Sequence, residues 1–122
     1  FGGFDGMFPA LMTEGVHRRG MRLERLAELT SENAARIMGL FPKKGNLLPG
    51  ADADIVVVDW DEEWMFDGKK SLSKTKSDKN IYHGMPMKGR VKQTWVRGKL
   101  VYQNGEIKGQ AGFGRYVSRH GK

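Results

Sequence analysis

Histidine is the residue through which this chain would most readily bind a metal ion or carry hydrolytic chemistry, because imidazole titrates near neutral pH and ligates metals. The three histidines are His17, His83 and His120. No two lie within four residues of each other, and no carboxylate completes a metal-binding pattern with them. Arg18 and Arg19 beside His17 would also repel a cation. We therefore assign no catalytic residue and no metal ligand to this chain, and interpret the histidines as surface residues.

Asp52 and Asp54 form the second candidate pair. They are two residues apart, so in an extended segment their carboxylates project from the same face. Such a pair could hold a hard cation or act in acid–base chemistry. Aspartates at the entry to a strand also commonly accept N–H hydrogen bonds from an adjacent turn, and we favour this structural role.

Other chemistry-bearing patterns are incomplete. Gly2, Gly3 and Gly6 follow no predicted strand and no Lys-Ser/Thr follows them, so a phosphate-binding loop is not indicated. No serine or threonine is paired with a base in a nucleophile motif. The tryptophans and tyrosines are interpreted as packing residues of a sheet. By its own residues, the chain shows no active site.

Charge divides the chain into two parts. Residues 1–68 carry 7 Lys/Arg and 12 Asp/Glu, whereas residues 69–122 carry 14 Lys/Arg and 2 Asp/Glu. The basic part could bind nucleic acid, face an acidic partner or subunit, or be a solvated surface. No nucleic-acid-binding motif accompanies it, so we expect neither nucleic acid nor membrane as a partner. There is no cysteine and no apolar run of membrane-spanning length, and we expect a cytoplasmic protein.

The first part of the chain is expected to be helical. Phe8–Met12 is predicted to form a short helix that Gly15 ends. Thr30 and Ser31 offer hydroxyl groups that would cap a helix over Glu32–Leu40. Between them, apolar residues at helical spacing indicate one more helix: Leu23, Leu26, Ala27 and Leu29.

Strands are expected after residue 54. The β-branched run Ile55–Val58 predicts a strand with both faces covered, and Trp64–Phe66 a further short one. Residues 69–80 have no periodicity and are expected to form a solvated, mobile loop. Two turns, Arg97-Gly98 and Asn104-Gly105, would connect the strands that follow: Val91–Val96, Lys99–Gln103 and Glu106–Ile107. Helices followed by strands predict an α+β fold.

The stretch Gly39–Trp60 carries a further signal. In order it contains Pro-Lys-Lys-Gly at 42–45, Pro-Gly-Ala-Asp-Ala-Asp at 49–54 and Ile-Val-Val-Val-Asp at 55–59. This order resembles the junction between barrel and β-domain in the cyclic amidohydrolases, which include the dihydroorotases, allantoinases, hydantoinases and dihydropyrimidinases. In that family the junction lies near the C-terminal end, so the chain resembles the last quarter or third of such an enzyme.

Other segments resemble the same family. Gly3–Leu11 is similar to the loop and helix after the last metal-binding aspartate, and Gly89–Gly105 to the closing hairpin. Gly112–Arg119 is similar to the tail of hydantoinases and dihydropyrimidinases. The chain departs from the family pattern where Phe8 replaces a glutamate and Arg22 a helix-capping serine.

The resemblance implies an α+β arrangement: terminal helices of a (β/α)8 barrel, then part of a small antiparallel β-sandwich domain. Residues 1–45 would be the end of the barrel, 46–107 part of the accessory β-domain, and 108–122 a basic tail. Asp5 matches a position where the backbone of dihydropyrimidinases contacts the substrate ring.

The resemblance also implies a parent that hydrolyses a C–N bond of a cyclic amide such as a hydantoin, dihydropyrimidine, dihydroorotate or allantoin. Two divalent metal ions, usually zinc, would be held by a His-x-His pair, a carboxylated lysine, two further histidines and an aspartate. This chain has no His-x-His, so it is expected to be inactive alone. We also expect it to self-associate, because barrel helices would expose their apolar stripes. A non-catalytic dihydropyrimidinase-related assembly protein and a basic nucleic-acid-binding module are the alternatives.

Overall fold

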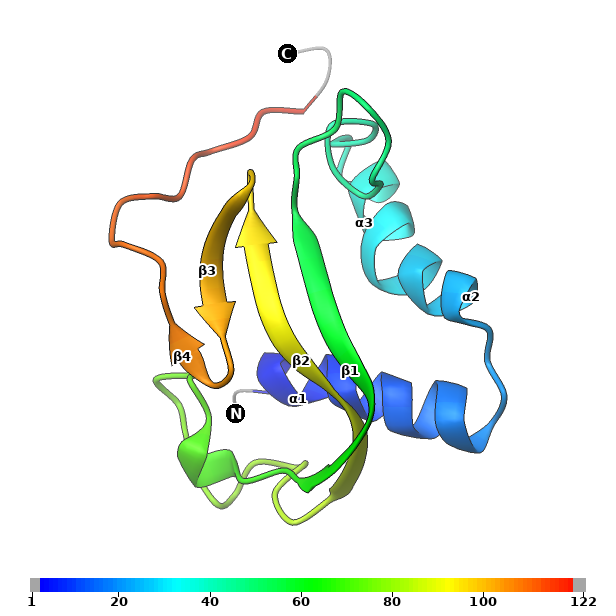
Figure 1. Cartoon of the computed structure of the whole chain (residues 1–122), viewed down its shortest axis with the longest axis vertical. Coiled ribbons are helices and arrows are strands. Elements are labelled where there is room, and N and C mark those ends of the chain that lie inside the picture. The colour runs from blue at the N-terminus through cyan, green and yellow to red at the C-terminus, as the bar shows by residue number, and fades with distance from the viewer. Residues whose placement is uncertain (1–2, 120–122) are drawn as a thin grey trace. The chain divides into compact units, whose positions relative to one another are not determined.

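The computed structural model describes residues 3–119 and shows helical segments followed by strands (Figure 1). The chain forms two compact units, each built from two segments. The first unit joins Phe1–Leu26 to Val58–Val91, and the second joins Ala27–Val57 to Lys92–Lys122. Among residues 3–119, no helix combines the length and the apolar character needed to cross a bilayer.

The helical elements are longer than the sequence predicts. Helix α1 (Phe4–Ala10) continues into a π-helical segment, η1 (Leu11–Arg18). The predicted end at Gly15 is wrong, because one glycine inside a helix costs only about 1 kcal/mol. Its missing side chain also makes room for Met21, whose Cε would lie 2.5 Å from an added Cβ. The helix ends instead just before Gly20, which has a φ of 69°, the left-handed conformation typical of helix C-termini.

A second helical run follows. Helix α2 (Leu23–Ala27) passes through the π-helical segment η2 (Glu28–Glu32) into α3 (Asn33–Ile37). The prediction that Thr30 and Ser31 cap a separate helix is therefore wrong, since both lie inside η2. Their hydroxyl groups signal a helix start only where a non-helical residue precedes, and here Ala27 is already in the α-helical conformation.

Four strands form one sheet in the order β1-β2-β3-β4, and β2, β3 and β4 pair antiparallel. Their bounds are β1 (Ile55–Met65), β2 (Pro86–Val96), β3 (Lys99–Gln103) and β4 (Glu106–Ile107). Trp64–Phe66 was expected to form its own strand; instead β1 runs without a break to Met65. Helices followed by an antiparallel sheet confirm the α+β prediction.

Both predicted turns are confirmed. Arg97 and Gly98 have φ values of 49° and 74°, and Asn104 and Gly105 have 47° and 92°. Two consecutive positive φ values are what a type I′ turn requires, and this turn suits the twist of the two strands it joins.

The prediction that Ile55–Val58 is covered on both faces is wrong. Ile55, Val56 and Val57 are 38%, 50% and 43% exposed. β1 is an edge strand of the sheet within residues 3–119, so one side of it has no neighbouring strand there. β-branched residues favour an extended backbone, but they do not specify what packs on it.

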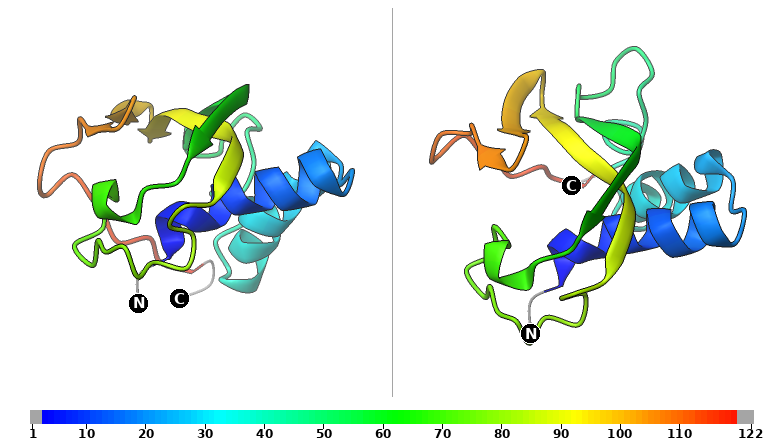
Figure 2. Two further views of the ribbon diagram at one scale, coloured as in Figure 1. Left: turned by 90° about the horizontal axis from the view of Figure 1, so that it is seen from below. Right: turned by 60° about the horizontal axis from the view of Figure 1, so that its bottom comes forward.

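In the first unit, the helical segment α1–η1 packs against β2 (Figure 2). Thr13 is buried, and its hydroxyl group accepts a hydrogen bond from the backbone N–H of Lys88 (2.9 Å) while donating one to the carbonyl of Pro9 (2.8 Å). Met12 and Met87, which are 1% and 2% exposed, fill the space around this contact. The hydroxyl group thus satisfies a strand N–H that would otherwise be buried without an acceptor.

Glycines allow this close approach. Gly89 has a φ of 91°, and an added Cβ would lie 3.1 Å from Sδ of Met12. At Gly6 on α1 an added Cβ would lie 2.2 Å from Cδ2 of Tyr82, so the tyrosine ring rests directly on the helix backbone. The Trp64 indole donates a hydrogen bond to the carbonyl of Gly89 (3.1 Å), which fixes β1 beside this contact.

The second unit is held by a different set of contacts. Gly45 lies so close to the helix that an added Cβ would be 2.6 Å from Cβ of Ala35. After β4, the chain runs back to the β2–β3 turn, where the Arg97 guanidinium donates a hydrogen bond to the carbonyl of Phe113 (2.6 Å). The same guanidinium lies 4.4 Å from the centre of the Phe113 ring, a cation–π distance.

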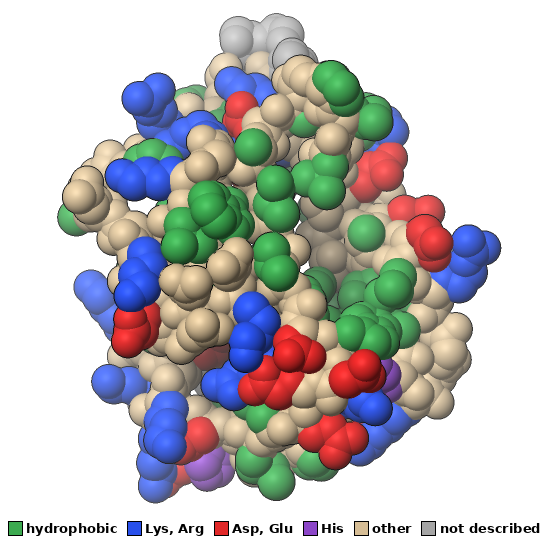
Figure 3. All heavy atoms as spheres, viewed as in Figure 1, with side chains coloured by type: hydrophobic (Ala, Val, Ile, Leu, Met, Phe, Trp, Pro, Cys, Tyr) green, Lys and Arg blue, Asp and Glu red, His purple; other side chains and the backbone are tan. Residues whose placement is uncertain are grey.

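Many large apolar side chains remain exposed, and apolar surface lies between charged residues on the face shown in Figure 3. Leu23, Leu29, Ile37 and Met38 on the second helical run are 51%, 44%, 82% and 50% exposed. Among the described residues, few apolar side chains are buried: Pro9, Met12, Leu26, Ala35, Phe66 and Met87. The four side chains named on the second helical run and its end therefore remain largely exposed within residues 3–119.

The buried hydroxyl of Thr13 leads to a stability prediction. Thr13→Val keeps the shape of the side chain but leaves the Lys88 N–H without its acceptor, which should lower the free energy of unfolding by about 1–3 kcal/mol. Urea unfolding followed by tryptophan fluorescence measures this change. Thr75→Val is the matched control, because Thr75 is exposed, and its effect should stay within about 0.5 kcal/mol. Equal effects of the two variants would contradict the assigned role of Thr13.

Candidate functional site

The histidines do not converge. The ring of His17 packs on Trp60, with 4.4 Å between ring centres, and its Nε2 is shielded from solvent without a hydrogen-bond partner among the described residues. His83 is exposed; its Nδ1 accepts a hydrogen bond from the N–H of Gly68 (3.1 Å). The interpretation as a surface residue thus fits His83 but is wrong for half-buried His17, whereas His120 lies outside the described residues.

Metal-binding side chains are likewise scattered. Within residues 3–119, no group of three or more histidines or carboxylates is placed to hold a metal ion. The histidine with the nearest carboxylate is His83, whose Nδ1 lies 3.5 Å from Oδ1 of Asp67. A pair of this kind does not supply the three or four protein ligands that a zinc ion takes.

Asp52 and Asp54 do lie together, as their spacing predicts, and they share one cation. Nζ of Lys44 is 2.8 Å from Oδ2 of Asp52 and 2.5 Å from Oδ2 of Asp54. The other carboxylate oxygen of Asp54 accepts a hydrogen bond from the backbone N–H of Arg97 (2.8 Å). The carboxylates thus tie the loop before β1 to the β2–β3 turn, all within the second unit.

The charges of this cluster shift the pKa values of Lys44 and Asp52. Burial works to lower the pKa of the Lys44 ammonium, but hydrogen bonds to Asp52 and Asp54 and their negative charges outweigh it and raise the pKa above 10.5. The contact with Lys44 holds the pKa of the Asp52 carboxyl below its ordinary value of 3.8. Both groups therefore stay ionised at neutral pH. A carboxylate with a depressed pKa is a poor proton acceptor, which favours the structural role over acid–base catalysis.

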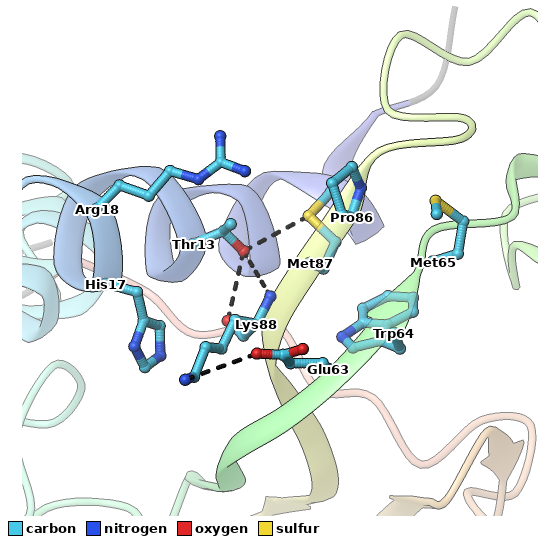
Figure 4. A pocket seen from close by; sticks show the side chains of 9 residues that line it. All are labelled: Thr13, His17, Arg18, Glu63, Trp64, Met65, Pro86, Met87 and Lys88. Atoms are coloured by element: carbon cyan, nitrogen blue, oxygen red, sulfur yellow. Dashed lines mark hydrogen bonds and ion pairs between the residues drawn. The ribbon is translucent and has the colours of Figure 1, made fainter.

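A cavity of about 620 Å³ opens in the first unit (Figure 4). Segment η1 and strands β1 and β2 line it with Thr13, His17, Arg18, Glu63, Trp64, Met65, Pro86, Met87 and Lys88. Its cations already have partners, since Arg18 pairs with Glu14 at 2.5 Å and Lys88 lies 3.8 Å from Glu63. The Thr13 hydroxyl group donates to a backbone carbonyl rather than to a base, so the cavity contains no activated nucleophile.

Of these lining residues, only His17 was a candidate for chemistry from the sequence, whereas Arg18 and the segment Trp64–Phe66 were considered in other roles. The signal for Thr13 was available, because it is a polar residue directly after the apolar pair Leu11 and Met12 in a helical stretch. No sequence pattern indicated a structural role for Lys88, since a lysine in a basic region is expected on the surface. Its backbone N–H, rather than its charge, is what the structure uses.

Asp5, the predicted backbone contact to substrate, lies in the first turn of α1. Its carboxylate accepts a hydrogen bond from the hydroxyl group of Ser71, within the first unit. The first N–H groups of a helix have no acceptor within the helix itself, so the backbone around Asp5 presents donors. Whether a substrate uses them stays a prediction.

This is an α+β chain whose candidate residues lie in charge-paired and packed clusters. Its family follows from comparison: the model of the amidohydrolase family matches residues 5–101. This chain belongs to the amidohydrolase family.

Individual relatives agree with that assignment. The L-hydantoinase of Paenarthrobacter aurescens is 36% identical over 117 residues, which are 96% of this chain and 25% of the relative. The mouse (Mus musculus) dihydropyrimidinase-related protein 5 is 36% identical over 93% of this chain and 20% of its own length. The solved structure of the L-hydantoinase (dihydropyrimidinase) from Arthrobacter aurescens superimposes with a TM-score of 0.86 at 37% identity, covering 91% of this chain and 24% of that one.

The predicted resemblance to cyclic amidohydrolases is thus confirmed, and hydantoinase and dihydropyrimidinase are the kinds of relative found. The chain spans about a quarter of the length of the curated relatives it matches.

The cluster of Lys44 with Asp52 and Asp54 predicts how stability depends on pH. Because the pKa of Asp52 is depressed, its stabilisation is present above pH 3.8 and is lost as the pH falls through the folded-state pKa. The raised pKa of Lys44 acts in the opposite direction, so its stabilisation is lost only above pH 10.5.

Lys44→Met should remove this dependence while keeping the length of the side chain. We expect the urea midpoint of the parent sequence to fall more between about pH 5 and about pH 3 than that of the variant. Lys74→Met, at an exposed lysine that is not among the causes of either pKa shift, is the control and should titrate like the parent sequence. If the urea midpoint of Lys44→Met fell as much over this pH range as that of the parent sequence, the cluster would contribute nothing to stability.

Proposed function

We propose that this chain is the C-terminal part of a metal-dependent hydrolase that opens cyclic amides at a C–N bond. Its substrates would be of the hydantoin or dihydropyrimidine type, with dihydroorotate and allantoin as the more distant possibilities. The observation that carries the proposal is the family match over residues 5–101, together with relatives that match nearly all of this chain.

The described residues do not fit a dinuclear metal centre. The His17 ring packs on Trp60, and Nδ1 of His83 accepts a hydrogen bond from the Gly68 N–H. Within residues 3–119, neither histidine belongs to a group of three or more side chains that could hold a metal ion. The two divalent ions that the family implies, zinc by resemblance, would therefore be held by residues of the longer protein. The three-quarters of the relatives' length without a counterpart here offers room for such ligands.

In this proposal the chain acts as a scaffold. Residues 1–45 would end the catalytic barrel, 46–107 would form part of the accessory β-domain and 108–122 a basic tail. The exposed apolar side chains of the second helical run support this reading, because Leu29 and Ile37 need a cover that residues 3–119 do not give them. Asp5 would sit at the substrate side and contact the substrate ring through its backbone.

A second candidate function has its own support. Dihydropyrimidinase-related protein 5 is as similar in sequence as the L-hydantoinase, at 36% identity. The parent of this chain could therefore be a related, non-catalytic assembly protein that keeps the fold without the metal ligands. The two candidates differ in the metal ligands of the parent. A His-x-His pair in the sequence of the full-length protein would favour the enzyme, and its absence the assembly protein.

Activity separates the candidates directly. The full-length protein should hydrolyse hydantoin or dihydrouracil, detected as loss of the ring absorbance, and should lose activity on chelation and regain it with zinc. The 122-residue chain at the same concentration should show neither hydrolysis nor stoichiometric metal. A full-length protein without metal and without hydrolysis would favour the assembly protein. Two metal ions bound per isolated chain would overturn the scaffold role.

A further inference from the structure

In the first unit, the segment between β1 and β2 folds back on itself, and we name residues 68–80 within it the closed loop (Figure 1). The carbonyl of Gly68 accepts a hydrogen bond from the Ser77 N–H (3.0 Å). Gly68 is buried, and an added Cβ would lie 2.2 Å from the Ser77 carbonyl oxygen and 2.9 Å from Cβ of Asn80. The closed loop is thus packed directly onto Gly68, and its shape depends on how this residue is held.

One side chain holds the N–H of Gly68. Nδ1 of His83 accepts a hydrogen bond from it at 3.1 Å. Because a backbone N–H can only donate, Nδ1 must carry a lone pair, so this bond exists only while the imidazole is neutral. A proton added to Nδ1 would turn the acceptor into a donor that faces another donor. The closed loop therefore has an anchor that protonation removes.

An acceptor for the added proton lies beside the ring. Oδ1 of Asp67 is 3.5 Å from Nδ1 of His83, just beyond hydrogen-bond distance. The same oxygen accepts a hydrogen bond from the Lys69 N–H (3.0 Å), and an ionised carboxylate has lone pairs for further donors. The side chains of Asp67 and His83 are each 36% exposed, so a small movement can join them without repacking the core.

The charged groups around His83 are two carboxylates and two ammonium groups. Lys69 lies 3.1 Å from Asp78, and Lys70 lies 4.0 Å from Asp67. The hydrogen bond from Lys69 holds the pKa of the Asp78 carboxyl below its ordinary value of 3.8, and the nearby charges of Lys69 and His83 act in the same direction. The opposite charges are equal in number, so the partner of Nδ1 decides which form of the loop is favoured.

Gly68 cannot keep its place once His83 lets go. Buried N–H groups without an acceptor are rare in folded proteins, so the backbone at Gly68 must turn toward water. The Ser77 N–H then loses its carbonyl partner as well. The closed loop also reaches α1, because the hydroxyl group of Ser71 donates a hydrogen bond to the Asp5 carboxylate in the first turn. Opening the loop would loosen this contact with the helix.

We propose that His83 is a proton-operated latch of the closed loop. In the neutral form, Nδ1 holds the Gly68 N–H and the loop is shut; in the protonated form, Nδ1–H pairs with Asp67 and the loop opens. Imidazole changes its charge between about pH 5 and about pH 8, so the latch responds near neutral pH. It does not depend on the proposed enzymatic function, because all of its parts lie within residues 67–83.

Amide hydrogen exchange tests the latch. In the 122-residue chain, followed by NMR from about pH 8 to about pH 5 and corrected for intrinsic exchange rates, protection of the Gly68 and Ser77 N–H groups should fall at least about tenfold. The fall should follow the titration of the His83 ring signals. The Lys88 N–H, which is bound to the Thr13 hydroxyl group, should stay protected. An equal loss at Lys88 would mean that the whole unit unfolds and would overturn the proposal.

His83→Asn separates the latch from a merely structural role. The asparagine Oδ1 takes the place of the imidazole Nδ1 and accepts the Gly68 N–H without titrating, so protection should stay high at both ends of the pH range. Asp67→Asn keeps an oxygen for the Lys69 N–H but removes the negative charge. In that variant the loop should open only at a lower pH than in the parent sequence.

The matched control is His17→Asn, at the other histidine within residues 3–119, and it should leave the pH dependence at Gly68 unchanged. Three results would overturn the proposal: equal protection of Gly68 at both ends of the pH range in the parent sequence, a loss on acidification that persists in His83→Asn, or a loss that disappears in His17→Asn. Circular dichroism of each variant checks that it folds, and Asp67→Asn remains a test if His83→Asn does not.

Discussion

The close approach of η1 to β2 is the constraint on which the first unit depends. It needs a hydroxyl group at Thr13 to satisfy the Lys88 N–H and a glycine at position 89 to admit Met12. Next to it, a glycine at position 6 of α1 admits the ring of Tyr82. These requirements are steric and polar rather than hydrophobic. The cavity beside this contact is lined by η1, β2 and β1, so how closely helix and strand meet contributes to its shape.

The second unit depends on the ion pairs of Lys44 with Asp52 and Asp54. Lys44 pairs with both Asp52 and Asp54, and Asp54 also accepts a hydrogen bond from the N–H of Arg97. Because these side chains are only partly shielded from water, the contacts hold the loop before β1 at the β2–β3 turn chiefly by their geometry. The residues with the strongest resemblance to a functional pair are thus the ones that hold a loop and a turn together.

Local chemistry was readable from the sequence, and tertiary context was not. The turns at Arg97-Gly98 and Asn104-Gly105 were predictable because glycine and asparagine tolerate a positive φ, which Arg97 adopts beside Gly98. The proximity of Asp52 and Asp54 was predictable from the period of an extended chain, but their partner Lys44 was not, since it comes from a loop whose path the sequence does not specify. The end of the first helix was misplaced because Gly15 and Gly20 look alike until their φ values are known. The packing of His17 on Trp60 joins residues 43 positions apart, and no local pattern signals it.

The contact between Arg97 and Phe113 constrains the length of the segment between β4 and Phe113. The guanidinium sits at the tip of a hairpin and reaches both the carbonyl and the ring of one residue, with the Lys99 ammonium 5.0 Å from the same ring centre. The stretch between β4 and Phe113 must therefore keep enough residues to return to that tip, although it contains no regular structure. Shortening this stretch would draw the Phe113 carbonyl and ring away from the hairpin and leave the Arg97 and Lys99 cations facing water.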